Sequence, residues 1–309
     1  MKTNSLASRG GWMKKRHIDR FFLTACLIPA IILITIVVLI PVLQAVQISL
    51  MEYKFISKHA PTWNNFGNYK ALFQSGDFTV YLKNTSIYIF FAVSISFGLA
   101  LFLSLLLNSK IKGRNVMRGM IFMSWTIPSV VNALLWTWLF QPQYGVLNYI
   151  FNKFGWLANE NQTWVQHPQL AMVTIIIAAV WAQTPYMMVM LLAGLQSVSS
   201  ELVEAAKIDG AGRFSILRYV QIPSIRPVID TAVLISVMTN SQMYTVIYNM
   251  TQGGPMNKTT TFAIAAYQEA FTGYNLGLGA ATGVVWLIII GLIVFLYKTY
   301  SERKISGYL

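Results

Sequence analysis

Residues 199–223 read SSELVEAAKIDGAGRFSILRYVQIP and carry the strongest structural signal in the chain. A serine at either of the first two positions can cap a helix, and Glu201 and Glu204 in its first turns suit the positive end of the helix dipole. Gly210 then supplies the residue type that most often ends a helix. The stretch therefore predicts a short helix that stops at a glycine turn.

A second short helix is predicted directly after that turn. Phe214, Leu217 and Val220 recur at i, i+3 and i+6, which gives this helix one apolar stripe. Pro223 is expected to end it, and Pro227 can begin the next helix because proline suits the first helical turn. The pattern indicates two short helices joined by a tight turn, with acidic residues on the first.

Long stretches without charged residues lie on both sides of this pair of helices. Six stretches of 18 or more residues lack Asp, Glu, Lys and Arg, namely 21–51, 84–109, 119–152, 161–200, 231–257 and 270–297. A membrane-spanning helix needs about 20 mostly apolar residues, so each stretch holds one span. The predicted spans are Phe22–Ile48, Thr85–Leu107, Gly119–Phe140, Ala171–Leu195, Val228–Tyr248 and Gly277–Tyr297.

Composition agrees with a membrane protein. Hydrophobic residues make up 55% of the 309 residues and charged residues only 11%, against about 25% charged in soluble domains. These values exclude a disordered chain, a coiled coil and a typical soluble enzyme. The expected fold class is an all-α polytopic membrane protein with six transmembrane helices.

The basic residues predict the orientation of the chain in the membrane. Of the 23 Lys and Arg, 17 lie in the two termini and in the loops after spans two and four, and six lie on the other side. Basic residues concentrate in the cytoplasm, so both termini are expected there. The expected parts are residues 1–20 as a cytoplasmic tail, 21–300 as the membrane domain, 197–226 as its cytoplasmic loop between spans four and five, and 301–309 as a second tail. This asymmetry also accounts for most of the +13 net charge without a nucleic-acid partner.

The chain lacks the residue patterns of an enzyme or of a self-powered carrier. It contains no G-x-x-x-x-G-K-[ST], H-E-x-x-H or G-x-S-x-G pattern, and its three histidines lie far apart. Proton- or sodium-driven carriers usually keep ionisable residues at membrane depth. Asp230 is the one candidate for such a residue, and it follows Arg226 and Pro227 so closely that it is expected at the cytoplasmic interface. These observations predict a pathway without catalytic residues, a metal site or an energy source of its own.

The loop between spans four and five resembles the EAA motif of binding-protein-dependent ABC transporter permeases. Glu204-Ala205-Ala206 is followed three residues later by Gly210, and nine residues after that come Val220-Gln221-Ile222-Pro223. The family has Ile and Leu where this chain has Val220 and Ile222, which are conservative departures. Asp209 and Ala211 extend the motif in the form typical of the carbohydrate branch, the maltose-type and glycerol-phosphate-type first permeases.

Shorter motifs agree with that branch, and the resemblance covers roughly residues 20–300. Phe66-Gly67-Asn68-Tyr69 precedes span two, Leu192-Ala193-Gly194-Leu195-Gln196 leads into the loop, and Thr251-Gln252-Gly253-Gly254-Pro255 follows span five. The resemblance implies the type I importer permease fold in the cell membrane of a prokaryote.

Partners and coupling residues are also implied by this resemblance. A second homologous permease completes the channel, two ATPase chains that bind ATP and Mg dock below it, and an extracytoplasmic solute-binding protein delivers a carbohydrate. This chain itself is expected to bind no cofactor. Glu204 is expected to form a charged contact with an ATPase, Ala205 and Ala206 to permit close approach, and Gly210 to permit the sharp turn. Asp209 belongs to the same set of ATPase-coupling residues.

Polar residues in spans four and five are the candidate substrate contacts. They are Asn240, Gln242, Tyr244 and Tyr248 in span five, and Trp181, Gln183 and Tyr186 in span four. Asn240, Tyr244 and Tyr248 recur at i, i+4 and i+8 and would share one stripe of a continuous helix. Amides and aromatic rings suit a neutral sugar, and the family branch favours an oligosaccharide. The same groups also form hydrogen bonds with neighbouring helices in many membrane proteins.

Three alternatives remain at this point. The first is an importer permease for glycerol phosphate or a polyol, the second a self-sufficient carrier, and the third a membrane-embedded enzyme. The sparse charge in the spans disfavours glycerol phosphate within the first alternative and leaves a polyol open, and the missing ionisable and catalytic residues disfavour the other two.

Overall fold

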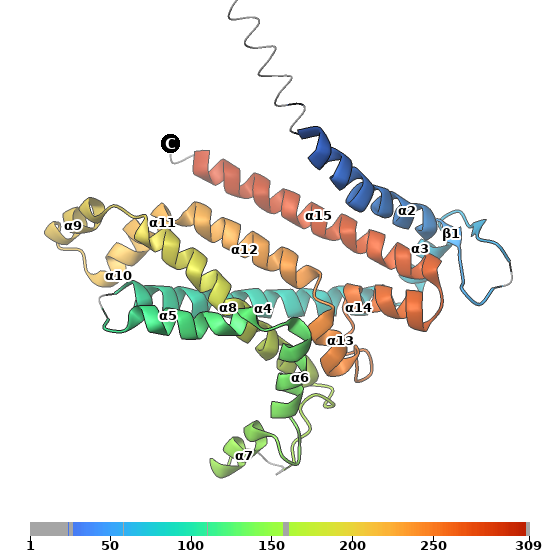
Figure 1. Cartoon of the computed structure of the whole chain (residues 1–309), viewed down its shortest axis with the longest axis horizontal. Coiled ribbons are helices and arrows are strands. Elements are labelled where there is room, and N and C mark those ends of the chain that lie inside the picture. Colours follow the sequence, from blue (N-terminus) through green and yellow to red (C-terminus); the bar gives the residue numbers. More distant parts are fainter. Residues whose placement is uncertain (1–23, 25–26, 58, 110, 157–160, 307–309) are drawn as a thin grey trace, which may run out of the picture.

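The computed structural model describes residue 24 and residues 27–57, 59–109, 111–156 and 161–306. Figure 1 shows a bundle of long helices with a short helical arm, α6 and α7, projecting from it. Short helices of the loop between spans four and five lie at one end of the bundle, and a two-stranded sheet lies at the other. The described part is therefore mostly helical, as predicted.

Four helices are long and apolar enough to cross a membrane singly. They are Leu27–Ser49 (which includes η1, Thr35–Leu39, and α2, Ile40–Ser49), α4 (Asp77–Asn108), α8 (Ala171–Gln196), and Leu276–Thr299 within α15 (Leu276–Ser306). They correspond to predicted spans one, two, four and six. The main difference is that α4 begins at Asp77, eight residues before the predicted start at Thr85.

Predicted span three is bent rather than straight. Helix α5 (Arg114–Met123) and the 3-10 turn η2 (Ser124–Thr126) meet α6 (Ser129–Leu139) at an angle of 97°. The cause is local, because the residue before a proline avoids the helical conformation. Ile127 accordingly has φ −73° and ψ 129° in front of Pro128. A continuous helix over Gly119–Phe140 was the wrong prediction.

Predicted span five is also interrupted. A bend of 71° lies before its predicted start at Val228 and separates residues 213–224, formed by α10 (Arg213–Ile216), η3 (Leu217–Gln221) and α11 (Ile222–Ser224), from α12 (Arg226–Ser241). The interruption itself comes further along. Helix α12 ends at Ser241, and α13 (Thr245–Thr251) begins after a break. The indole nitrogen of Trp286 on α15 donates to the carbonyl of Ser241 at 2.9 Å and so stabilises this helix end. The predicted continuous helix over Val228–Tyr248 is therefore wrong.

The remaining elements are short. They are α3 (Gly67–Gln74), α7 (Val146–Lys153), α9 (Ser200–Ile208), α14 (Phe262–Tyr267), η4 (Gln268–Thr272), and the antiparallel strands β1 (Met51–Glu52) and β2 (Thr62–Trp63). Helix α14 packs closely on α15, because a side chain at Gly279 would meet the carbonyl of Ala266 at 2.7 Å.

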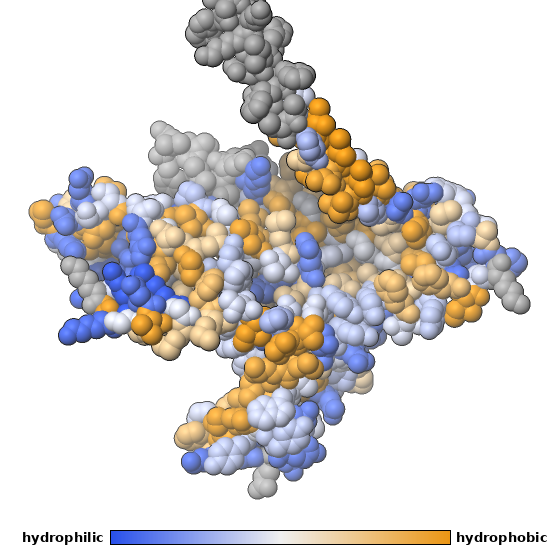
Figure 2. Space-filling model, viewed as in Figure 1, coloured by the Kyte–Doolittle hydropathy of each residue, from blue (hydrophilic) through white to orange (hydrophobic). Residues whose placement is uncertain are grey.

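The core lies between α4 and α8. Small buried residues such as Ala92, Ala100, Ala178 and Ala179 let helices approach closely, and the buried side chains of Tyr88 and Ile175 fill the space around them. The N-terminal helix contributes little to this core. Figure 2 shows a continuous hydrophobic surface along it, where Leu33 and Val37 are more than 60% exposed. Such a surface is suited to lipid or to another membrane helix.

Candidate functional site

The loop between spans four and five forms the predicted pair of short helices. Ser199 caps α9, and its hydroxyl accepts a hydrogen bond from the amide of Glu201 at 3.2 Å. The chain then reverses at Gly210, where φ is +81°, and the amide of Ala211 donates to the carbonyl of Ala206 at 2.9 Å. The positive φ, and not a lack of space, requires glycine here, because nothing lies within 4 Å of the position that a Cβ would take.

Apolar side chains are exposed around this turn. Ile208 is 86% exposed, Phe214 and Tyr219 are each 72% exposed, and Leu202 is 55% exposed. Glu204 is exposed beside them, and no salt bridge reaches it within the part of the chain that the structure describes. Exposed apolar side chains around an acidic residue are typical of a surface that binds another protein.

The second short helix differs from its predicted pattern. A π turn, η3, occupies Leu217–Gln221, so the helical period changes within the predicted stripe. Ile216 is buried and Leu217 and Val220 are half-buried, whereas Phe214 is exposed. Phe214 therefore belongs to the exposed surface rather than to a packed stripe, and the helical segment ends one residue after Pro223.

Asp230 lies in the first turns of α12, close to this loop. The hydroxyl of Tyr297 donates to its Oδ1 at 3.1 Å, and Nε of Arg226 lies 3.8 Å from its Oδ2. These neighbours hold it near the start of α12, and its expected place at the cytoplasmic interface stays a prediction.

Two predicted substrate residues bind each other inside the bundle. Asn240 on α12 is 2% exposed, and its amide donates to Oε1 of Gln183 on α8 at 2.7 Å. Gln183 donates in return to Oδ1 of Asn240 at 3.0 Å. The amide of Asn240 also donates to the carbonyl of Ser236 at 2.8 Å. The hydrogen bonds between neighbouring helices that the sequence allowed are therefore present at these two residues.

Tyr244 and Tyr248 stack on each other at the start of α13. Their ring centroids are 5.0 Å apart with an interplanar angle of 23°, and Tyr267 lies 4.8 Å and 5.1 Å from the two rings. Asn240 does not continue their stripe, because α12 ends between them. Gln242 is exposed in that break and lines an open hollow of about 500 Å³ together with Tyr244.

Tyr267 was not among the sequence-predicted residues. It precedes the charge-free stretch of span six, and Phe271 follows it at i+4 with a centroid distance of 5.1 Å. The spacing of Tyr267 and Phe271 at i and i+4 was the one sequence feature that could have indicated Tyr267 as a site residue. Its closeness to Tyr244 depends on how α14 packs beside α13.

The predicted aromatic residues of span four lie against the bend between α5 and α6. Tyr186 stacks on Trp125 with centroids 5.5 Å apart and planes at 16°, and Trp181 meets Trp136 edge-on at 6.0 Å. The hydroxyl of Ser124 also donates to the carbonyl of Trp181 at 3.3 Å. Trp181 and Tyr186 therefore pack beside the break in span three. Of the three candidates in span four, Gln183 is the one that forms hydrogen bonds with span five.

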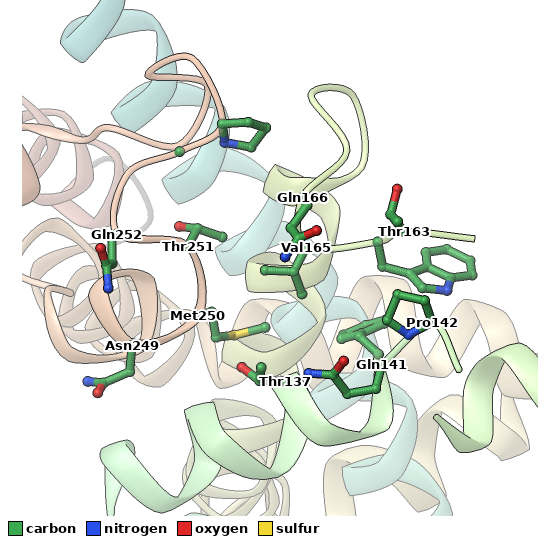
Figure 3. A pocket seen from close by; sticks show the side chains of 14 residues that line it. Thr137, Gln141, Pro142, Thr163, Val165, Gln166, Asn249, Met250, Thr251 and Gln252 are labelled. Atoms are coloured by element: carbon green, nitrogen blue, oxygen red, sulfur yellow. The ribbon is translucent and has the colours of Figure 1, made fainter. Parts of the chain in front are cut away.

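A polar pocket of about 320 Å³ lies beyond the far end of α13 (Figure 3). Its labelled side chains come from the end of α6, from the segment before α8 and from the end of α13. They include the amides of Gln141, Gln166, Asn249 and Gln252 and the hydroxyls of Thr137 and Thr163. No Asp, Glu, Lys or Arg occurs among the described residues that line it.

A buried asparagine holds the segments around this pocket in place. The amide of Asn148 on α7 donates to the carbonyls of Pro142 at 2.9 Å and Gln162 at 3.0 Å. Its oxygen accepts a hydrogen bond from the indole of Trp164, which also lines the pocket. The pocket therefore combines a fixed frame with uncharged polar side chains, which can hydrogen-bond hydroxyl groups.

Comparison with known proteins places this geometry among transport proteins. Residues 94–307 match the family described as "Binding-protein-dependent transport system inner membrane component". The chain is 32% identical to the probable ABC transporter permease protein PH1215 of Pyrococcus horikoshii, over 94% of this chain and 98% of that protein. It is 30% identical to the trehalose/maltose transport system permease protein MalF of Thermococcus litoralis, over 85% and 88% of the two chains.

The fold is shared with a solved transporter. A chain of a bacterial ABC transporter involved in the import of the acidic polysaccharide alginate superimposes with a TM-score of 0.80. The alignment covers 94% of this chain and 98% of that chain at 22% sequence identity. At this identity the comparison supports the fold alone.

Proposed function

This chain belongs to the family of binding-protein-dependent transport system inner membrane components, and on that premise we propose that it is the permease subunit of an ABC importer for a neutral carbohydrate. The observation that carries the proposal is the course of α12. Helix α12 follows the exposed α9–α10 loop after η3, α11 and a bend of 71°, and it ends at the break at Gln242, beside Tyr244. A force applied to the loop would therefore reach the polar residues.

ATP hydrolysis belongs to other chains in this proposal. The sequence contains no phosphate-binding loop, and the loop surface around Glu204 is suited to a protein partner. Two ATPase chains that bind ATP and Mg dock there, with Glu204 in a charged contact and Ala205 beside it. A second permease completes the channel, and an extracytoplasmic binding protein delivers the substrate. The loop and both termini then face the cytoplasm of a prokaryotic cell.

Two hollows define the proposed substrate path. The polar pocket at Gln166 and the hollow at Gln242 are connected by α13, which follows Tyr244, carries Tyr248 at its middle and contributes Asn249 and Thr251 to the polar pocket. Seven residues of helix rise only about 10 Å, so an extended sugar chain can contact both hollows. We propose substrate contacts at Tyr244, Tyr248 and Gln242.

The other predicted substrate contacts, which lie inside the bundle, are proposed to belong to the same path. The Gln183–Asn240 pair is proposed to exchange part of its mutual hydrogen bonding for sugar hydroxyls when the helices move. Trp181 and Tyr186 are proposed to line the path from the side of the bend in span three, where both are half-buried against Trp136 and Trp125.

The lining residues favour an uncharged substrate over a phosphorylated one. Amides, hydroxyls and aromatic rings line both hollows, and neither hollow has a Lys or Arg among its described lining residues. A phosphate group would be left without a cationic partner, which costs several kcal/mol in a partly buried site. A neutral sugar matches these groups through its hydroxyls and its apolar ring faces.

The test is coupled ATP hydrolysis by the complete transporter in lipid nanodiscs. Sugar-loaded binding protein should stimulate hydrolysis by the wild-type complex, and Glu204→Ala should abolish this stimulation. Glu201→Ala is the matched control, because Glu201 is also exposed on α9 but lies outside the EAA motif. Full coupling in Glu204→Ala, or sugar transport without ATP, would refute the proposal and favour a self-sufficient carrier.

A further inference from the structure

A second, larger groove lies between α4 and α8 and takes no part in the proposed sugar path. Its volume is about 630 Å³, and its residues come from the first half of α4, the start of α8 and the turn at 256–258. The polar pocket and this groove share no lining residue. The groove is therefore separate from the polar pocket.

The lining changes from polar to apolar along the groove. Its polar end carries Lys83, Asn84, Gln169, Asn257 and Lys258. Its other end is lined by hydrophobic side chains of the two helices, namely Ile87, Phe91, Ile95, Met172, Val173, Ile176 and Ile177. A molecule that fits this groove must have a polar group at one end and an apolar body at the other.

Two lysines at the polar end are held on adjacent segments. The amide of Asn84 donates to the carbonyls of Asn257 at 2.7 Å and Thr260 at 3.0 Å, so the turn that carries Lys258 is fixed to the turn of α4 that carries Lys83. Both lysines are exposed, and neither forms a salt bridge within the described residues. Two free ammonium groups at one end of a groove attract an anion.

The apolar part has the length of one lipid leaflet. Ile87, Phe91 and Ile95 line one face of α4, and the distance from Lys83 to Ile95 along the helix is about 18 Å. Half of the hydrocarbon core of a bilayer measures about 15 Å. Phe91 is 46% exposed and Val173 is 44% exposed, so both have surface available to an acyl chain.

We propose that this groove binds an anionic phospholipid, with its phosphate between Lys83 and Lys258 and one acyl chain along Phe91 and Val173. The lipid belongs to the leaflet on the side opposite the α9–α10 loop, where α4 and α8 both begin. A sugar would gain little from the apolar lining, and a second membrane helix would leave both ammonium groups unpaired. The bound lipid connects the turn at 256–258 with α4 and α8, and therefore stabilises the outer end of the bundle.

The test is native mass spectrometry and thermal unfolding of the complete transporter, with the lipid composition controlled. Wild type reconstituted with phosphatidylglycerol should retain bound phosphatidylglycerol after transfer to detergent, and should unfold at a higher temperature than in phosphatidylcholine alone. The double variant Lys83→Gln/Lys258→Gln should bind it at least about tenfold more weakly, because each lysine contributes to attraction of an anionic headgroup.

The matched control is Lys70→Gln/Lys153→Gln, which removes the same charge from two exposed lysines outside the groove. This control should keep the retained lipid and the thermal shift. Equal loss in both double variants would show only a general charge effect, and would overturn the proposal.

A further variant separates the lipid from a free phosphate ion and from a protein occupant. Val173→Trp fills the apolar part and leaves both lysines, so it should abolish lipid retention. Inorganic phosphate at millimolar concentration could displace the bound phosphatidylglycerol while Val173→Trp leaves its retention unchanged. The site would then be an anion site without an acyl-chain groove. If Val173→Cys cross-links to the second permease and no lipid is retained, a protein helix occupies the groove. Either result would refute the proposal.

Discussion

Gln183 and Asn240 join α8 to α12 through two reciprocal amide hydrogen bonds of 2.7 Å and 3.0 Å. The two residues are 57 positions apart in the sequence, and Asn240 is almost fully buried. This pair lies between the helix that leads into the α9–α10 loop and the helix that leads out of it. It therefore holds together the two helices that have to move if the loop is pulled.

Breaking this pair should destabilise the protein. Gln183→Ala leaves the Asn240 amide with fewer partners, and an unsatisfied buried polar group costs about 1–3 kcal/mol. The thermal unfolding temperature in detergent should fall, and Gln183→Ala/Asn240→Ala should lose less than the sum of the two single variants. Gln242→Ala is the control, because Gln242 is exposed. Additive losses in the double variant would mean that the two amides do not act as a pair.

Removing one tyrosine ring should weaken sugar transport. Tyr248→Ala removes one of the three rings of the Tyr244–Tyr248–Tyr267 cluster, and one aromatic contact is worth about 0.5–1.5 kcal/mol. The KM for sugar uptake in proteoliposomes should rise about three- to tenfold, whereas Tyr248→Phe, which keeps the ring, should change it much less. Tyr149→Ala removes an exposed tyrosine on α7 and serves as the control. An unchanged KM in Tyr248→Ala would remove the cluster from the substrate path.

A methyl group at Gly210 should uncouple the loop. Gly210 has φ +81°, and a non-glycine residue in the left-handed region costs about 1–2 kcal/mol. Gly210→Ala should reduce the stimulation of ATP hydrolysis by loaded binding protein without lowering the unfolding temperature of the membrane helices. Gly212→Ala is a matched control, since Gly212 has φ −71° and nothing lies within 4 Å of its added Cβ. Equal effects of both substitutions would argue against a role for the turn geometry.

Glu269 should make stability depend on pH. Burial, with a further contribution from Asp77, raises the pKa of the Glu269 carboxyl above its ordinary value of 4.5. In the pH range directly above 4.5 the folded chain therefore binds this proton more tightly than the unfolded chain, so its contribution to stability falls as pH rises. Relative to Glu269→Gln, the unfolding temperature of wild type should rise as the pH is lowered towards 4.5.

Exposed Glu201 provides the comparison for that measurement. Glu201→Gln removes an exposed carboxylate from α9 and controls for the loss of one negative charge. If the unfolding temperatures of wild type and Glu269→Gln change with pH in parallel, the pKa of Glu269 is the same in the folded and unfolded chains, and the prediction is wrong.

The sequence by itself determined the family, the four unbroken spans and the loop between spans four and five. These features depend on local properties: charge is absent over the whole length of α4 beyond Lys83 and of α8, Ser199 caps α9, and Gly210 takes the left-handed conformation. A local property can be recognised without knowing what the segment packs against.

The tertiary structure alone decided where span five breaks and which polar groups meet. Helix α12 ends at Ser241, whose carbonyl accepts a hydrogen bond from Trp286, a residue 45 positions further along the chain. Tyr267 joins Tyr244 because α14 folds back beside α13, and Gln183 reaches Asn240 because α8 packs against α12. Helical periodicity assumes that a helix continues, so it placed Asn240 and Tyr248 on one stripe. Contacts between residues far apart in sequence end that helix, and a repeat within one segment contains no information about them.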